Sequence, residues 1–381
     1  MTARRLSLLL VVAAVVVLVV GRLAPDRFAF VPRVVPDFGV YWAAASVNAA
    51  GHDPYTGPAA EAAQRTIDPN FAPLRANSGP WTLAVLTPFT LVAYEPARLA
   101  WFLLETALLM GCGGSLWKLY GGDPKNADAG WLLAVSGYAG LQALTLGQLS
   151  PLVLGACVGF VLAERAGRDV VAGLCLSLLL VKPQNQLVVM AVGLVWLLDG
   201  RRWGLLGGAV LGAVGLSLVA AAGNPATFRQ YLDALSDRPP ADWMPPLPAT
   251  LLRLAFGWDR YWLTFLPLVP GVAWGLWYYR RHRRGWQWAE RLPLLLLVSY
   301  LASPYGWAYD QLVFLFPLIQ WAARTGRTTA ALGLNLVLTA YYFALLNLRV
   351  PEFHWVWTAP AALVAYGIVA RSACEGEFRP R

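Results

Sequence analysis

The sequence predicts an all-α protein that crosses a membrane about twelve times, and three observations support that prediction. Hydrophobic residues make up 58% of the 381 residues, whereas charged residues make up 13%, about half the share usual in soluble proteins. The hydrophobic residues gather in helix-length runs separated by polar breaks. Arginines dominate the net charge of +9 and cluster in short breaks, which is typical of cytoplasmic loops and not of a nucleic-acid-binding surface.

The chain begins with a basic segment, residues 1–5, and a continuous apolar run at 6–20. This pattern is also typical of a signal peptide, but the sequence around Arg22 and Pro25 offers no convincing small-residue cleavage site. We therefore expect a retained first helix with its N-terminus in the cytoplasm. Residues 25–79, rich in Ala, Pro, Asn and Asp, are expected to form a first outer loop with one or two helices along the membrane surface.

Twelve further hydrophobic runs follow, at about 80–94, 97–117, 130–147, 151–164, 170–181, 186–198, 203–222, 261–279, 291–302, 309–323, 328–347 and 355–370. Together with the first run they make thirteen. Arg4, Arg5 and Arg371 place both termini in the cytoplasm, which requires an even number of crossings. One run must therefore fail to cross, and the candidates are the short, proline-containing run at 80–94 and a part of 97–147.

From Arg165 onward, arginine-rich breaks alternate regularly with arginine-poor breaks. The alternation assigns residues 223–260 to a second outer loop. We expect residues 1–381 to form one integral domain in the inner (plasma) membrane, with its functional site facing the periplasm or exterior.

A polar break at 182–186 interrupts the apolar runs. Its basic flanks, Arg168 and Arg202, are both expected in the cytoplasm, so 170–198 should form a hairpin with an outward tip. Each limb of about twelve residues gives roughly 18 Å of helix against a hydrocarbon core of about 30 Å. A lysine facing lipid at that depth would cost on the order of 3 kcal/mol. Lys182 therefore either contacts an anion or pairs with an acid such as Asp310 to hold helices together.

Asp37 stands at the start of an alanine-rich segment in the first outer loop. It follows a proline and precedes residues 40–50, which favour a short helix. Its carboxylate is either the cap of that helix or a catalytic group at the membrane boundary. Gln148 stands before a Ser-Pro helix start. It either forms part of an ordinary turn or contacts a substrate. Asp310 opens a helix and is either a cap or a site residue.

The order of these motifs resembles glycosyltransferase family 87. The motifs are the aspartate in the first outer loop, Gly-x-Asp-Pro-Tyr at 51–55, Gly-Gln at 147–148, Lys-Pro-Gln at 182–184 and Ser-Pro-x-x-Trp-x-Tyr-Asp at 303–310. The resemblance covers roughly residues 35–325. It implies a membrane enzyme of the GT-C fold, and the family includes polyprenol-phosphate-mannose-dependent α-mannosyltransferases of mycobacteria. Mycobacterial members look like Ser-Pro-x-Ser-Trp-x-His-His at the last motif, and both histidines are absent here.

The resemblance implies a polyprenyl-phosphate sugar as donor, a glycan or glycolipid as acceptor, and inversion at the anomeric carbon. It also implies that Asp37 is the general base. The leaving phosphate needs a cation, which Lys182 fits, and we assign Gln184 to the same phosphate. Further substrate contacts are expected from the outer-loop and break residues Tyr41, Asp53, Tyr55, Gln148, Tyr305, Trp307, Tyr309 and Asp310. The aromatic members either stack on a sugar ring or belong to an interfacial belt.

Two other classes of membrane protein remain open at this point. A lipid or sugar transporter or flippase would also have broken helices with buried polar groups. An acyltransferase or a ligase of lipid-linked glycans is the third class, although the sequence offers neither a His-Asp pair nor a setting for a serine nucleophile. The four cysteines and three histidines have no metal-ligand spacing. No metal, no other cofactor and no nucleic-acid partner are therefore expected.

Overall fold

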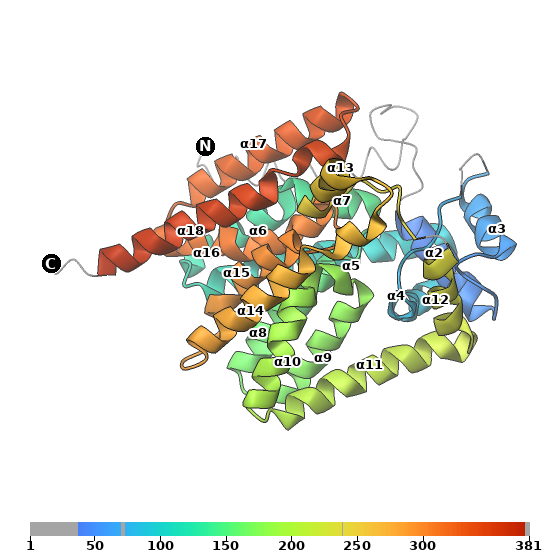
Figure 1. The fold of residues 1–381 in the computed structure, drawn as a ribbon, viewed down its shortest axis with the longest axis horizontal. Coiled ribbons are helices and arrows are strands. Elements are labelled where there is room, and N and C mark those ends of the chain that lie inside the picture. The colour runs from blue at the N-terminus through green and yellow to red at the C-terminus, as the bar shows by residue number, and fades with distance from the viewer. Residues whose placement is uncertain (1–36, 70–72, 238, 378–381) are drawn as a thin grey trace. The chain divides into compact units, whose positions relative to one another are not determined.

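The computed structural model describes residues 37–69, 73–237 and 239–377, with side chains as far as residue 369 (Figure 1). Every regular element in these ranges is a helix and none is a strand, which confirms the predicted all-α class. The first helix expected at 6–20, with Arg4 and Arg5, lies outside the described residues. The side chain of Arg371 lies outside them as well, so the sidedness of both termini stays a prediction.

The described chain divides into two compact units. The first contains residues 37–111, 140–182 and 203–241, and the second contains 112–139, 183–202 and 242–377. Two helices, α5 (Tyr94–Leu119) and α7 (Tyr138–Leu146), each continue from one unit into the other. Whether both units make one catalytic domain, as the sequence led us to expect, stays a prediction.

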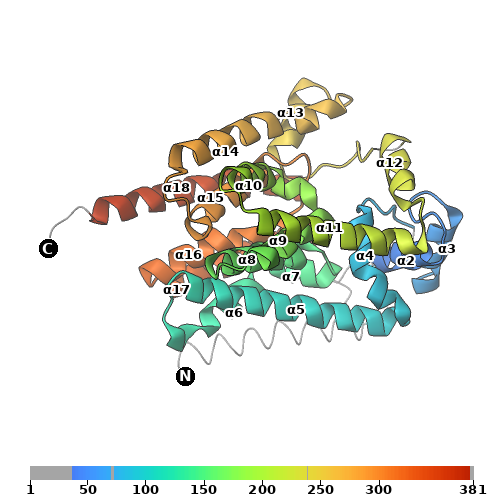
Figure 2. The ribbon, with the colours of Figure 1, turned by 90° about the horizontal axis from the view of Figure 1, so that it is seen from below.

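The first unit is built around α8, α9 and α11, which lie side by side in Figure 2. In the same unit α2 packs against α3, α4, η2 and α11. Glycines bring α9 and α11 into close contact, since a Cβ on Gly173 would lie 2.1 Å from the Leu205 carbonyl oxygen. Such contacts between small residues are typical of helices packed in membranes. The helices of this unit, besides α5 and α7, are α2 (Asp37–Ala49), α3 (Pro58–Ile67), α4 (Pro80–Leu86), η2 (Thr87–Leu91), α8 (Ser150–Arg165), α9 (Asp169–Ser177), η4 (Leu178–Val181), α11 (Trp203–Gly223) and α12 (Thr227–Asp237).

The described part of the segment predicted to form the first outer loop, residues 37–69 and 73–79, is largely helical, as predicted. It contains α2 and α3, which pack against each other, and α2 also packs against α4. Proline begins both α3 and α4, a position where its missing N–H costs nothing. The run at 80–94 contains only the seven residues of α4 and the five of η2 before α5 begins. Both pieces are too short to cross a membrane, which agrees with the suspicion that this run does not cross.

The second unit is built around α15, which packs against α10, α14, α16 and α18. In Figure 1 the axes of the helices from α14 to α18 are inclined in roughly the same way. The elements of this unit are η3 (Pro124–Asn126), α6 (Asp128–Ser136), η5 (Pro183–Gln186), α10 (Leu187–Asp199), α13 (Pro248–Phe256), η6 (Tyr261–Phe265), α14 (Leu268–His282), α15 (Trp288–Leu301), η7 (Ala308–Phe314), α16 (Leu315–Thr325), α17 (Thr328–Asn347), η8 (Glu352–Trp355) and α18 (Thr358–Glu377).

Three described helices, α5, α11 and α17, are long and apolar enough to cross a membrane. The broken pair of Pro124–Ser136 and Tyr138–Leu146 makes a fourth if it counts as one span. The chain is therefore a helical membrane protein, whereas about twelve crossings and the GT-C arrangement stay predictions. The limbs on either side of Lys182 are short, as expected. However, they belong to different units, because α9 packs against α8 and α11 while α10 packs against α14 and α15.

Candidate functional site

A tight turn between α7 and α8 fixes the backbone of Gln148. The N–H of Gln148 donates to the Ala143 carbonyl at 2.9 Å, and Gly147 has a φ of +68°, as in the common glycine helix ending. A Cβ on Gly147 would lie 2.5 Å from the Cβ of Phe38, so the glycine also makes room for α2. The Trp101 indole donates to the Gly147 carbonyl at 3.2 Å. The start of the Gln148 side chain is therefore rigidly placed.

Lys182 follows η4 at the point where the helix stops. Its backbone leaves the helical region, with φ −151° and ψ 64°, because the following residue is Pro183. The Lys182 N–H still donates to the Leu179 carbonyl at 3.2 Å. One residue earlier, Thr82 of α4 donates its hydroxyl to the Val181 carbonyl at 2.9 Å. The lysine thus starts from an anchored backbone, and it is buried, with 8% of its surface exposed.

Asp37 is the first residue of α2, as the sequence predicted, and it is half-buried. Tyr41 follows four residues later and so lies on the same face of the helix. Two contacts fix α2 in the first unit. The ring of Phe38 stacks on Trp101 with centroids 5.5 Å apart, and the Asn48 side chain donates to the Ala220 carbonyl at 2.8 Å. The carboxylate at the helix start is therefore held by packing at both ends of α2.

The side-chain amide of Gln148 joins three other residues into one cluster. Its Oε1 accepts a hydrogen bond from Lys182 Nζ at 3.1 Å and another from the Tyr41 hydroxyl at 3.2 Å. Its Nε2 donates to Asp37 Oδ2. The partners fix the orientation of the amide, because an ammonium can only donate and an ionised carboxylate can only accept. We call Asp37, Tyr41, Gln148 and Lys182 the Gln148 cluster.

The Gln148 cluster combines a proton acceptor with a cation. Gln148 is 1% exposed and Lys182 is 8% exposed, whereas Asp37 and Tyr41 are only half-buried. The carboxylate can therefore be reached by a substrate, while the ammonium lies deeper. A buried cation favours an anion that comes within its reach. This arrangement suits a reaction in which a hydroxyl loses its proton and an anionic group leaves.

Asp53 and Tyr55 lie in the same unit but have local structural partners. The Asp53 carboxylate accepts the Tyr55 N–H at 2.8 Å and the Thr56 hydroxyl at 2.5 Å, which is the geometry of an aspartate turn. Tyr55 is buried against Tyr231 of α12, with ring centroids 5.4 Å apart, and burial raises the pKa of its phenol. These contacts make both residues part of the loop architecture, and a role in substrate binding stays a prediction.

The second unit contains the remaining predicted site residues. Ser303 fixes the break at 303–310, since its Oγ lies 2.9 Å from the Gln184 carbonyl oxygen and 2.7 Å from Asn185 Oδ1. Gln184 thus contributes its backbone carbonyl to this contact. Asp310 is the third residue of η7 and not its N-cap; its carboxylate accepts the N–H of the N-cap Trp307 at 3.0 Å, as in a capping box, and its role in the site stays a prediction. Tyr309 and Asp310 are both buried.

Tyr305 and Trp307 form an aromatic cluster with Trp243, which lies in the segment predicted to be the second outer loop. The Trp243 ring lies 5.7 Å from the Tyr305 ring and 6.0 Å from the Trp307 ring, measured between centroids. All three side chains are half-buried, so part of their surface can be reached from solvent. Trp243 was not among the site residues predicted from the sequence. Its signal was a tryptophan in a proline-rich loop segment, which predicts no particular partner.

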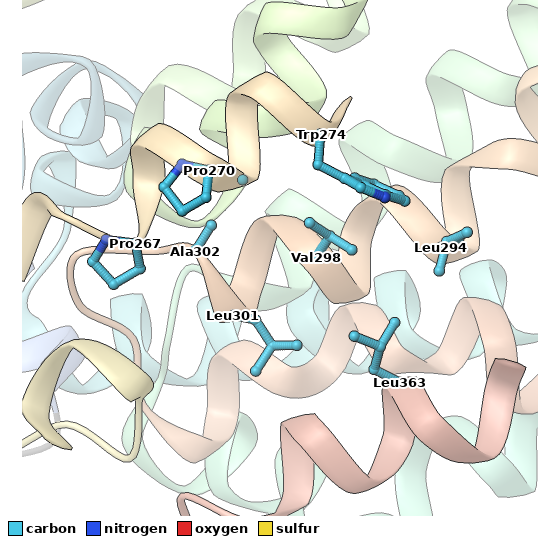
Figure 3. Close-up of a pocket in the computed structure, with 9 residues that line it drawn as sticks. Pro267, Pro270, Trp274, Leu294, Val298, Leu301, Ala302 and Leu363 are labelled. Carbon is cyan, nitrogen blue, oxygen red and sulfur yellow. The ribbon is translucent and has the colours of Figure 1, made fainter. Parts of the chain in front are cut away.

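An apolar pocket of about 420 Å³ opens in the second unit. Figure 3 shows Pro270 and Trp274 of α14 opposite Val298 and Leu301 of α15, with Leu363 of α18 along one side. The remaining lining residues are Pro267, Gly271, Leu294 and Ala302. No charged side chain lines the pocket. Its chemistry therefore suits hydrocarbon and not a sugar or a phosphate.

In the part of the chain that the structure describes, no three His, Cys, Asp or Glu side chains gather closely enough to hold a metal ion. The expectation that the protein needs no metal stays a prediction, because it concerns the reaction and not the arrangement of these side chains.

Comparison with known proteins gives one match. The family model of glycosyltransferase family 87 matches residues 79–304, which is more than half of the chain. Gln148, Lys182 and Trp243 lie inside the matched region, whereas Asp37 and Trp307 lie outside it. No curated protein and no solved structure matches the sequence.

Proposed function

Since the chain belongs to glycosyltransferase family 87, we propose that it is an inverting enzyme that transfers a hexose from a polyprenyl-phosphate sugar. We propose mannose as the hexose and a lipid-linked or cell-envelope glycan as the acceptor. The family establishes the reaction class, a glycosyltransferase. The donor, the sugar, the acceptor and the residues of the site are the proposed part.

The proposed reaction needs two groups from the protein. An acceptor hydroxyl attacks C1 of the donor sugar from the face opposite the phosphate, and a new C1–O bond forms as the C1–O(phosphate) bond breaks. The hydroxyl proton moves to the Asp37 carboxylate. The electron pair of the broken bond moves to the phosphate oxygen, whose negative charge the Lys182 ammonium stabilises. The polyprenyl phosphate then leaves.

The observation that supports this proposal best is the Gln148 cluster. One amide bonds to both the Asp37 carboxylate and the Lys182 ammonium. These residues come from three separate stretches of the chain. A helix cap needs only a carboxylate and the N–H groups of its own helix. A cap alone therefore gives no reason for the lysine and the glutamine at the same place.

The aromatic cluster of the second unit supports the assignment to sugar chemistry. Tryptophan and tyrosine rings offer apolar faces together with polar edges, which matches the alternating apolar and hydroxylated surfaces of a sugar. We propose that Trp243, Tyr305 and Trp307 contact a sugar ring of the acceptor. We also propose that the enzyme is a multi-pass protein of the inner (plasma) membrane, with its site facing the periplasm or exterior.

The test is transfer from radiolabelled polyprenyl-phosphate sugars in membranes with and without the protein. We expect a new labelled glycan with the wild-type chain and about 10²- to 10⁴-fold less with Asp37→Asn. Asparagine keeps an amide oxygen that can accept the Gln148 hydrogen bond, so the variant removes the base and little else. An Asp37→Asn variant with most of its turnover would contradict the assignment of the base.

The same assay separates the enzyme from a flippase. A flippase moves labelled donor between the leaflets of a vesicle without forming a glycosidic bond. Donor movement without labelled glycan, across mannose and other hexose donors, would contradict the proposal as a whole.

A further inference from the structure

We infer that Gln148 is a positioning residue that aligns the proposed base and the proposed phosphate-binding cation, and not a ligand of the sugar. The inference rests on the proposed function, because it concerns the same site. It changes the role that the sequence suggested for Gln148, which was a contact to substrate.

The hydrogen bonds of Gln148 leave little capacity for a sugar. Its amide oxygen accepts two hydrogen bonds, from Lys182 and from Tyr41, which is the full capacity of a carbonyl oxygen. One of its two amide N–H groups is directed to Asp37. The side chain is 1% exposed. A sugar hydroxyl would have to displace one of these partners in order to bind.

The same bonds restrain both reacting groups. The bond from Gln148 Nε2 to Asp37 Oδ2 limits rotation of the carboxylate and so sets the direction of its other oxygen. The bond from Lys182 Nζ limits the motion of a flexible four-carbon side chain. Alignment of this kind matters, because a misplacement of about 1 Å can lower a rate by about 10²-fold.

The backbone of Gln148 is suited to such a role. Gly147 in its left-handed conformation, with the Trp101 indole bonded to its carbonyl, leaves the turn little freedom. Gln148 therefore transmits a fixed geometry from the turn to Asp37 on α2 and to Lys182 after η4.

Gln148→Leu tests the inference through the kinetics of transfer. Leucine keeps the approximate size but removes all three hydrogen bonds. For a positioning residue we expect kcat to fall about 10- to 100-fold while KM for the donor changes little. A rise in KM with kcat retained would identify a substrate ligand and overturn the inference. Unchanged kinetics would also overturn it.

A matched control is available in Gln142, also buried, which stands six residues earlier in α7. Its Oε1 has no hydrogen-bond partner among the described residues. Gln142→Leu makes the same chemical change without touching the Gln148 cluster, so we expect wild-type kinetics. If Gln148→Leu disappears from the membrane while Gln142→Leu accumulates, the role of Gln148 is purely structural and the inference is wrong.

Gln148→Glu gives a readout that a merely structural role would not move. The variant places a second carboxylate beside Asp37, and the negative charge of one carboxylate raises the pKa of another at hydrogen-bond distance. Since the reaction needs Asp37 without its proton, the acid limb of the pH–rate profile should move to higher pH by at least about one unit. The other groups that face this position, Tyr41 and Lys182, are unchanged. An acid limb at the same pH as in the wild-type enzyme would overturn the inference.

A second measurement does not depend on transfer activity. A carbodiimide modifies carboxyl groups in their protonated form, and mass spectrometry of the peptide that contains Asp37 measures the extent. In Gln148→Glu, modification of Asp37 should persist to higher pH than in the wild-type chain. If the wild-type chain transfers no sugar, the proposed function fails. The pH dependence of carbodiimide modification then still shows whether the side chain at position 148 contacts Asp37. If the pH dependence of modification does not change, the positioning role fails while the proposed function stands.

Discussion

The rigidity of the turn before Gln148 can be tested by adding one methyl group. Gly147 and Gly167 end their helices in the same way. Gly147 has a φ of +68°, and Gln148 N–H bonds to the Ala143 carbonyl at 2.9 Å. Gly167 has a φ of +67°, and Arg168 N–H bonds to the Ala163 carbonyl at 2.9 Å. Alanine at either position meets the same backbone strain.

The two positions differ in the space around the added Cβ. At Gly167 nothing lies within 4 Å. At Gly147 the Cβ would lie 2.5 Å from Phe38 Cβ and 3.4 Å from Trp101 Cδ1. Phe38 is 1% exposed and its ring stacks on Trp101, so it has no open space to move into. The methyl group must therefore displace α2 or the turn itself.

The expected losses of stability follow from the backbone strain and from the crowding of the added Cβ. A left-handed alanine costs about 1–2 kcal/mol, offset by about 0.4–1 kcal/mol because alanine lowers the entropy of the unfolded chain. Gly167→Ala should therefore reduce the free energy of unfolding by about 1 kcal/mol. Overpacking adds about 1–3 kcal/mol, so Gly147→Ala should cost about 2–4 kcal/mol. Any movement of Phe38 also moves its neighbour Asp37, and activity per folded molecule should fall about tenfold or more.

The assay compares thermal unfolding of both variants in detergent and transfer activity per folded molecule. We expect Gly147→Ala to unfold several degrees below Gly167→Ala and to lose activity, while Gly167→Ala keeps its activity. Equal losses of stability in the two variants, with equal activity, would refute the argument. They would mean that Phe38 gives way and that its packing does not fix the turn.

Lys182→Met should reduce use of the lipid donor strongly while the protein still accumulates in the membrane, and full activity of this variant would exclude a phosphate contact. Trp243→Ala should raise KM for the acceptor several-fold with kcat nearly unchanged, and an unchanged KM would reduce the aromatic cluster to a packing contact. Asp53→Asn should keep both stability and activity because asparagine forms the same turn, whereas an inactive Asn variant would move the proposed base to Asp53. Single cysteines at Thr56 and Asp242, two exposed positions, should react with an impermeant thiol reagent from outside, and reaction from the cytoplasmic side would contradict the predicted topology.

Local sequence signals predicted the helices, because the start and the end of a helix depend on residues that are close together in the chain. The proline before Asp37 and the alanines after it predicted a helix start, and α2 begins at Asp37. The Gly-Gln-Leu-Ser-Pro stretch predicted the break before α8, because glycine ends one helix and proline begins the next. The number of crossings did not follow in the same way. A run of twelve apolar residues packs inside a protein as readily as it enters a membrane.

The Gln148 cluster could not be derived from local signals, because its contacts join distant residues. Gln148 and Asp37 are 111 positions apart, and Gln148 and Lys182 are 34 apart. The sequence showed that each residue stands at a break, and the resemblance to a family suggested roles. The hydrogen bonds that join the residues depend on how α2, the turn before α8 and the end of η4 pack together.

The hydrogen-bond partners of each aspartate carboxylate distinguish aspartates whose roles the sequence left open. Asp37 and Asp310 each had a capping interpretation, whereas Asp53 was expected to contact substrate. The bonds described for Asp53 go to groups within three residues along the chain, which satisfies a turn. Asp37 instead accepts a bond from a side chain on a distant segment, and that side chain also binds a buried ammonium. A helix cap does not require such a partner. The difference in hydrogen-bond partners therefore favours Asp37 as the base.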